Sequence, residues 1–186
     1  MAMQNSIKEM MAFNEIFVAE KKYEIYQTSK LPDKKLAVLA CMDTRLTELL
    51  PAALGLHNGD IKLIKSAGAL ISHPCGSLMR RLLIAVYIMG VEEIAVIGHH
   101  DCGLEGFDPD LILNAMKDRG IPQEKIDQLN NWDVDPRRWL KGFDNVHDSV
   151  RQTVVSIREH PLMPKDILVQ GLIIDPHTGR LDLVDE

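Results

Sequence analysis

The sequence lacks the features that a membrane protein or a nucleic-acid-binding protein needs. Its longest apolar stretch, Leu82–Met89, is too short to cross a bilayer. Lysine and arginine number 21 against 27 acidic residues, a net charge of −6, so no broad basic face for nucleic acid is expected. The chain also contains no repeats and no low-complexity tracts. We therefore expect neither a membrane nor a nucleic acid as partner.

Disulfide bonds and a secretion signal are not expected either. The chain has three cysteines, an odd number, without the spacing of a small disulfide-bonded scaffold. Residues Met1–Asn14 are amphipathic and include a glutamate, whereas a signal peptide has a basic start and an apolar block. These features predict a cytoplasmic protein whose thiols serve metal or thiol chemistry.

A single α/β domain, residues 1–186, is expected from the length and from the order of the elements. The chain has 46% hydrophobic and 26% charged residues, the balance of an ordinary globular domain. Short apolar runs typical of buried strands alternate with amphipathic segments typical of helices. This order predicts a central, largely parallel sheet flanked by helices. The predicted strands are Lys35–Ala40, Ile61–Lys65, Glu93–Gly98 and Ile167–Ile174. The predicted helices are Leu46–Leu54, Cys75–Met89, Asp110–Arg119, Gln123–Asn130 and Asn145–His160, with an irregular segment at Trp132–Phe143.

The two ends of the chain are expected to depart from this core. At the C-terminus, the residues Asp175–Gly179 predict a turn that leads into an antiparallel strand, Arg180–Val184. At the N-terminus, apolar residues at helical spacing predict one long helix over Ser6–Thr28, ended by Leu31-Pro32-Asp33. This helical arm, residues 1–30, would pack either on a neighbouring subunit or on its own.

Two cysteines and a histidine follow predicted strands. Cys41 comes after Lys35–Ala40, and His99 and Cys102 come after Glu93–Gly98. The carboxyl ends of parallel strands meet at one edge of a sheet, where ligand sites form. Two thiolates and an imidazole suit Zn²⁺, and three protein ligands with an open fourth position are typical of a catalytic zinc. The alternative is that the cysteines are small core residues without a metal.

The order and spacing of three motifs resemble the β-class carbonic anhydrase family, in particular its short bacterial and archaeal branch. The motifs are Cys41-Met42-Asp43-Thr44-Arg45, Lys65-Ser66-Ala67-Gly68 and His99-His100-Asp101-Cys102, and residues 171–181 also match. By this resemblance, Cys41, His99 and Cys102 bind one Zn²⁺ per subunit. The family pattern selects the histidine three residues before the cysteine, which is His99 and not His100.

An acid and a base follow the first cysteine by two and four residues. Two thiolates cancel the charge of Zn²⁺, so the ion promotes ionisation of water less than a zinc held by three histidines. Asp43 is expected to accept a hydrogen bond from zinc-bound hydroxide, and Arg45 to hold Asp43 through a bidentate pair. A released Asp43 would become the fourth ligand, a closed state that the family contains. The alternative is an ordinary ion pair at a strand end.

The second motif is expected to contact the substrate. By the resemblance, Lys65, Ser66 and Gly68 line the site that takes bicarbonate. A glycine at position 68 allows the backbone to approach the pocket closely. Ser66 stands where many relatives carry asparagine, so the hydrogen bond of that asparagine is not carried over to this chain.

The resemblance implies a zinc lyase that reversibly converts CO₂ to bicarbonate and a proton by zinc-hydroxide attack. A second hypothesis is hydrolysis of carbonyl sulfide or carbon disulfide in the same site, because relatives of this fold carry it out. A third is a non-catalytic zinc site that Asp43 keeps closed, although the presence of Arg45 argues against it. Members of the family exchange N-terminal helices, which implies a homodimer or a higher homo-oligomer.

Overall fold

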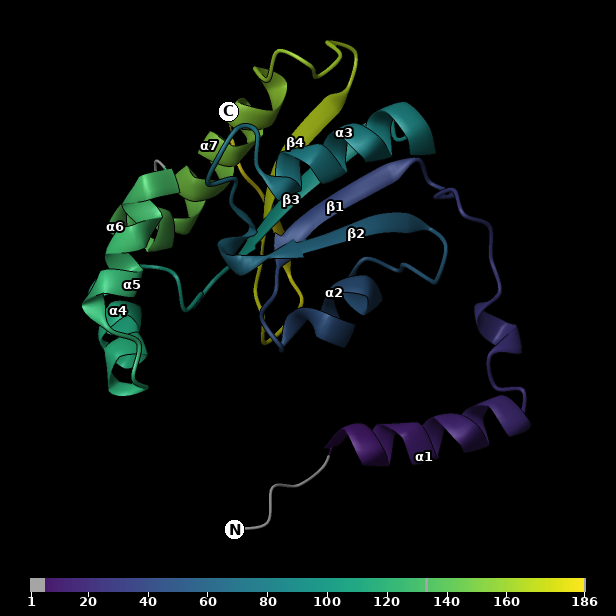
Figure 1. Cartoon of the computed structure of the whole chain (residues 1–186). Helices are drawn as coiled ribbons and strands as arrows, with labels where there is room; N and C mark the ends of the chain where they lie inside the picture. The colour runs from purple at the N-terminus through teal and green to yellow at the C-terminus, as the bar shows by residue number, and fades with distance from the viewer. Residues whose placement is uncertain (1–5, 133, 186) are drawn as a thin grey trace.

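A mostly parallel sheet forms the centre of the computed structural model, which describes residues 6–132 and 134–185 (Figure 1). Within these residues the strand order is β2-β1-β3-β4-β5. The strands are β1 (Leu36–Cys41), β2 (Ile61–Ser66), β3 (Glu93–His99), β4 (Leu168–Ile174) and β5 (Leu181–Leu183). The first four are mutually parallel, and β5 runs antiparallel to β4. The predicted α/β fold class, with an antiparallel strand at the C-terminal end, is confirmed.

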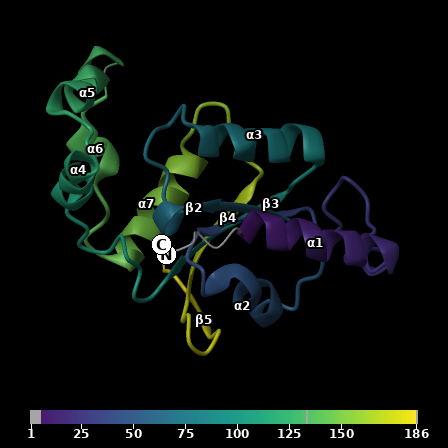
Figure 2. The ribbon, with the colours of Figure 1, turned by 60° about the horizontal axis from the view of Figure 1, so that its bottom comes forward.

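Helices cover both faces of this sheet (Figure 2). The covering helices are α2 (Leu46–Ala53), α3 (Ser77–Met89) and α7 (Val146–Arg158). Along β1, Ala37 and Leu39 belong to the core formed with α3 and α7, whereas Val38 and Ala40 belong to the core formed with α2. Successive side chains of a strand point to opposite faces. A central strand that is apolar at every position is therefore buried on both sides, as the sequence predicts.

A helical lobe is inserted between β3 and α7 and lies beside the sheet (Figure 1). It contains α4 (Pro109–Asp118), α5 (Gln123–Asp127), a 3₁₀ helix (Gln128–Trp132) and α6 (Pro136–Leu140). Two backbone hydrogen bonds join its two ends, from Gly106 N to Phe143 O at 2.8 Å and from Phe143 N to Leu104 O at 3.0 Å. The segment expected to be irregular therefore contains a helix, because Asp135 caps it by accepting from the backbone N–H of Arg137 and Arg138. Similarly, the predicted helix Gln123–Asn130 is α-helical only as far as Asp127.

The N-terminal helix is shorter than the sequence pattern predicts. Helix α1 covers Ser6–Ala19, and a short 3₁₀ helix, Glu24–Tyr26, follows it. Lys21 adopts a left-handed conformation with φ of 55°, and Lys22 N donates to Phe17 O at 3.1 Å. This is a Schellman-type helix end, which usually contains glycine at the left-handed position. The sequence has lysine there, so the end of the helix had no visible signal.

The N-terminal helix also stands away from the rest of the molecule (Figure 1). None of the residues of α1 is buried. Two side-chain hydrogen bonds connect the segment after it to the rest of the protein. Asn58 Nδ2 donates to Tyr26 O, and Lys62 Nζ donates to Lys30 O. Among the described residues, no helix is both long enough and apolar enough to span a membrane.

Candidate metal centre

The sheet brings two of the predicted ligands to one edge. Cys41 is the last residue of β1 and pairs with Ser66, the last residue of β2. His99 is the last residue of β3, and β1 lies directly beside β3 in parallel register. Both side chains therefore emerge at the carboxyl ends of neighbouring strands, where sites form in parallel sheets. Cys102 follows His99 through a short loop that returns it to the same edge.

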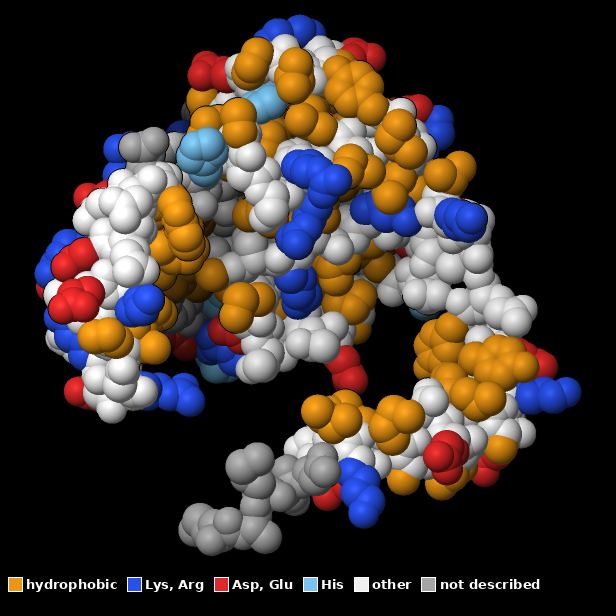
Figure 3. Space-filling view, in the orientation of Figure 1, with side chains coloured by type: hydrophobic (Ala, Val, Ile, Leu, Met, Phe, Trp, Pro, Cys, Tyr) orange, Lys and Arg blue, Asp and Glu red, His pale blue; other side chains and the backbone are white. Residues whose placement is uncertain are grey.

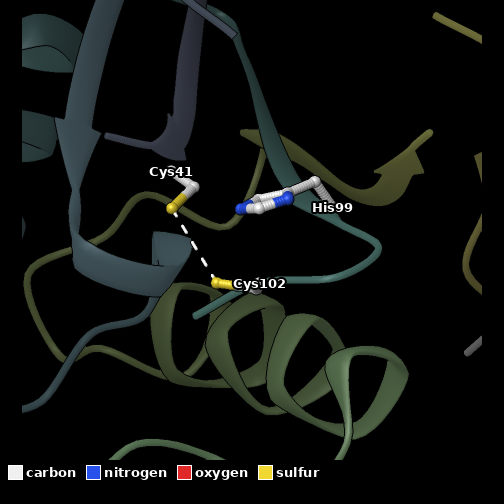
Figure 4. Close-up of side chains that lie close together, drawn as sticks. All are labelled: Cys41, His99 and Cys102. Carbon is white, nitrogen blue, oxygen red and sulfur yellow. Dashed lines mark hydrogen bonds between the residues drawn. The ribbon is translucent and has the colours of Figure 1, made fainter. Parts of the chain in front are cut away.

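The three ligand atoms form a compact buried cluster (Figure 4). Sulfur and nitrogen atoms of Cys41, His99 and Cys102 all lie within 4.8 Å of one another, and the two sulfurs are 4.0 Å apart. The residues are 5%, 1% and 7% exposed. Two thiolates on a tetrahedral zinc, with Zn–S near 2.3 Å, would be about 3.8 Å apart. The observed separation fits a zinc ion held by all three side chains.

The imidazole of His99 is oriented as a metal ligand requires. Its Nδ1 lies 2.8 Å from the carbonyl oxygen of His100, which assigns the proton to Nδ1 and leaves a lone pair on Nε2. Nε2 is buried without a hydrogen-bond partner among the described residues. Such a buried, unpaired polar atom costs about 1–3 kcal/mol. A metal ion bound to Nε2 would satisfy it.

The two thiols ionise unequally because they lie so close together. A hydrogen bond from Cys102 lowers the pKa of Cys41 to about 4 against the opposing effect of burial, and Gly68 N donates a further hydrogen bond to its sulfur at 3.4 Å. The same interaction with Cys41, together with burial, raises the pKa of Cys102. Burial alone would lower the pKa of His99, but the Cys41 sulfur and the His100 carbonyl outweigh it and raise this pKa. Cys41 is therefore the thiol of the pair that ionises first, and the thiolate is the form that binds metal.

Asp43 and Arg45 form a bidentate pair beside this cluster. Arg45 donates from Nε to Asp43 Oδ1 at 3.0 Å and from Nη2 to Asp43 Oδ2 at 2.9 Å, and its backbone N–H also donates to Oδ1. These hydrogen bonds lower the pKa of Asp43 to about 2, and the pairing raises the pKa of Arg45. Asp43 Oδ2 lies 3.8 Å from Nε2 of His99. An ionised carboxylate is thus fixed next to the ligand cluster.

The three predicted substrate contacts lie in different surroundings. Lys65 Nζ donates to Leu46 O at 3.2 Å, and burial lowers its pKa against the opposing charges of Cys41 and Asp43. Ser66 Oγ is buried without a hydrogen-bond partner among the described residues. Gly68 has φ of 70°, in the left-handed region that favours glycine. Their part in binding substrate stays a prediction.

Sequence reasoning missed three residues at this centre. Leu104 and Phe143 pack against the core cluster that contains Cys41 and Cys102. A Cβ atom at Gly68 would lie 3.0 Å from Phe143 Cε1 and 3.1 Å from Leu104 Cδ1, so these rings and methyls close the space above the glycine. The third is Asp101, which contacts Arg45. Phe143 had no local signal, whereas Asp101 lies between two predicted ligands and could have been considered.

The sheet and the buried cluster define the chain as an α/β protein with a Cys₂His group that could hold a metal ion at the carboxyl ends of its strands. The carbonic anhydrase family model matches residues 36–181, which include the whole cluster. The chain therefore belongs to the β-carbonic anhydrase family, as the three sequence motifs indicate.

Two relatives and one solved structure illustrate the range of similar proteins. "Putative carbonic anhydrase YtiB" of Bacillus subtilis is 52% identical, over 96% of this chain and 95% of that protein. A carbon disulfide hydrolase of Acidithiobacillus thiooxidans is 31% identical, over 89% of this chain and 85% of its own. The crystal structure of β-carbonic anhydrase isoform I from Trichomonas vaginalis is 31% identical, with a TM-score of 0.89 over 97% of this chain and 98% of that one.

Proposed function

We propose that the protein is a zinc lyase that reversibly hydrates CO₂ to bicarbonate and a proton. One observation carries this proposal. An ionised carboxylate, Asp43, is held by Arg45 at 3.8 Å from the metal-facing nitrogen of His99. A structural zinc site needs only its ligands, whereas an oriented hydrogen-bond acceptor beside an incomplete ligand set suits hydration chemistry, in which a nucleophile must be held in position.

Cys41, His99 and Cys102 are the residues that would hold zinc. A zinc ion bound there supplies Lewis acidity, which makes water acidic enough to act as a nucleophile near neutral pH. The chain provides three ligands, so a fourth position is open to a small molecule.

Asp43 is the residue that we assign to orienting the nucleophile. It is a pure hydrogen-bond acceptor, because Arg45 keeps its pKa at about 2. A water molecule that donates to this carboxylate has its lone pair directed away from Asp43, into the site. Arg45 occupies both carboxylate oxygens, which favours a carboxylate that does not itself bind the metal. This pairing supports an open catalytic site over one that Asp43 keeps closed.

The walls of the site suit a small apolar substrate and an anionic product. Leu104 and Phe143 pack against the core cluster that contains Cys41 and Cys102, so CO₂ beside the metal ligands would meet apolar side chains. We assign Lys65 to the electrostatic attraction of bicarbonate and the unpaired hydroxyl of Ser66 to a hydrogen bond with it.

The decisive test is CO₂ hydration by protein of measured zinc content. We expect activity in proportion to bound zinc, lost on chelation and restored when zinc is returned. Zinc-loaded protein that shows no hydration above the buffer would refute the proposal.

Carbon disulfide or carbonyl sulfide is the second candidate substrate. The observation that favours it is the 31% identity to a carbon disulfide hydrolase. Both molecules are linear and apolar like CO₂, so the same ligands and the same apolar wall would accept them. Parallel assays of the three substrates on one zinc-loaded preparation would decide, and we expect CO₂ to be turned over fastest.

We also propose that the N-terminal arm mediates a homodimer or a higher homo-oligomer. Its helix α1 exposes many large apolar side chains (Figure 3): Ile7, Met10, Met11, Phe13, Ile16 and Val18. Apolar surface of this extent usually marks an interface. Replacing Phe13 and Ile16 by glutamate should reduce the mass in light scattering to that of one 20.9 kDa chain. The control Ala12→Glu, which adds the same charge on the face of the helix that carries Glu9 and Glu15, should leave the mass unchanged. A cytoplasmic location stays a prediction from the cysteine content.

A further inference from the structure

Asp101 lies in the loop between the second and third ligands. The loop starts where His99 ends β3, and His100 N donates to Ile174 O at 3.2 Å, which pins it to the end of β4. Asp101 adopts a left-handed conformation with φ of 53°. Aspartate and asparagine enter this region more readily than other residues with a side chain. The turn alone could therefore explain a residue of this kind, but not the contacts that its side chain makes.

Two groups of Asp101 hold the outer end of the Arg45 guanidinium. Arg45 Nη1 donates to Asp101 Oδ2 at 2.7 Å, and Nη2 donates to the carbonyl oxygen of Asp101 at 2.8 Å. Nε and Nη2 are engaged with Asp43 on the other side. The guanidinium is thus fixed between two aspartates, and its plane is set by four hydrogen bonds.

The contact with Asp101 contributes little to folding stability. The Asp101 side chain is 78% exposed and that of Arg45 is 33% exposed. Exposed ion pairs of this kind have small effects on stability. The effect of Asp101 should therefore fall on the direction in which Arg45 points.

We propose, building on the zinc enzyme proposed above, that Asp101 is a positioning residue: it anchors Arg45 so that Arg45 keeps Asp43 away from the open metal position. Asp43 Oδ2 is only 3.8 Å from His99 Nε2, so a carboxylate that loses its partner lies close enough to compete for the metal. Without the Asp101 anchor, Arg45 would turn toward solvent more often. Asp43 would then occupy the open position in a larger fraction of molecules.

The test is azide binding to the Co²⁺-loaded protein, followed through the visible absorption of cobalt. Azide binds only where the fourth position is open, so its apparent Kd rises as the open fraction falls. For Asp101→Gly, which permits the same turn, we expect Kd to rise by up to about fivefold, the upper limit for an exposed charge pair. Asp101→Asn keeps the turn and an acceptor oxygen, and should recover part of the affinity.

Simple electrostatics predicts the opposite sign. Removing a negative charge near an anion site should strengthen azide binding, so a weaker affinity requires Asp43 to close the site. Asp101→Gly should accordingly not weaken azide binding in an Asp43→Ala background. The matched control is Asp148→Asn, since Asp148 is 75% exposed and pairs with Arg151 on α7. It should leave azide affinity unchanged.

A rise in Kd for Asp101→Gly that disappears in the Asp43→Ala background supports the proposal. An unchanged or lower Kd, or an equal rise in both backgrounds, overturns it. If Asp101→Gly fails to take up cobalt, Asp101→Asn carries the same comparison, with the same two outcomes. Failure of the proposed function would be seen separately, as wild-type protein that binds cobalt and azide but hydrates no CO₂ when loaded with zinc.

Discussion

Two regions of this chain carry functional predictions: the metal edge, which is the edge of the sheet with Cys41, His99 and Cys102, and the N-terminal arm. They differ in whether the chain itself supplies the surface against which their residues pack. At the metal edge, Cys41 and His99 end neighbouring strands whose register is set by a buried core. Helix α1 is also rich in large apolar residues, yet none of its residues is buried. A pattern of residues therefore defines a structure fully only when the same chain supplies the surface that it packs against. The following predictions test that difference, from the largest expected effect to the smallest.

Loss of one ligand should have the largest effect. In Cys102→Ser, a hard hydroxyl replaces a soft thiolate, and two ligands remain. We expect zinc content to fall below about a tenth of one ion per chain and CO₂ hydration to fall at least about 100-fold. Metal analysis and a hydration assay on the same sample measure this. Cys75→Ser is the matched control, because Cys75 is exposed and lies outside the cluster. A zinc-loaded, active Cys102→Ser protein would contradict the ligand assignment.

The sequence was sufficient to bring Cys41, His99 and Cys102 to one edge of the sheet, because each of them lies at, or close to, the end of a buried strand. Strand identity, parallel pairing and the edge at which the side chains meet all follow from local apolar runs. It was not sufficient for Phe143, which follows the helical lobe in the sequence. Backbone hydrogen bonds with Leu104 and Gly106, which precede the lobe, hold Phe143 beside the site. It also missed the end of α1, where Lys21 takes the place of the usual glycine. Long-range contacts and atypical caps leave no local signature.

The core behind the metal edge should be sensitive to truncation. Ile97 is 1% exposed and belongs to the cluster that includes Cys41 and Cys102. Ile97→Ala leaves a cavity and should lower the free energy of unfolding by about 2–5 kcal/mol, and Ile97→Val by about 0.5–1.5 kcal/mol. Urea denaturation of the metal-free protein measures both. A loss below about 0.5 kcal/mol for Ile97→Ala would mean that packing around Ile97 contributes less to the free energy of unfolding than its burial indicates.

Asp43→Asn should separate catalysis from metal binding at the same edge. Asparagine has the shape of aspartate but lacks its charge, so Arg45 loses the bidentate pair shown in the structure. We expect full zinc content with CO₂ hydration reduced about 10- to 100-fold, or roughly 1.4–2.7 kcal/mol in barrier. Asp148→Asn is again the control. If hydration were unchanged at equal zinc content, the Asp43–Arg45 pair would be an ordinary surface ion pair.

Truncation of the arm should have the smallest effect on a single chain. Ile16 is 53% exposed, and in an isolated subunit Ile16→Ala should change the free energy of unfolding by less than about 0.5 kcal/mol. At protein concentrations where subunits associate, the same substitution should cost more, because the apolar side chain is then buried against a partner. The measurement is urea denaturation at two concentrations, one well below and one well above the association midpoint. A cost near that of Ile97→Ala at the lower concentration would show that α1 packs on its own subunit. A cost that grows with concentration would show that the apolar side chains of the arm are buried against a second chain, whereas those at the metal edge are buried within one chain.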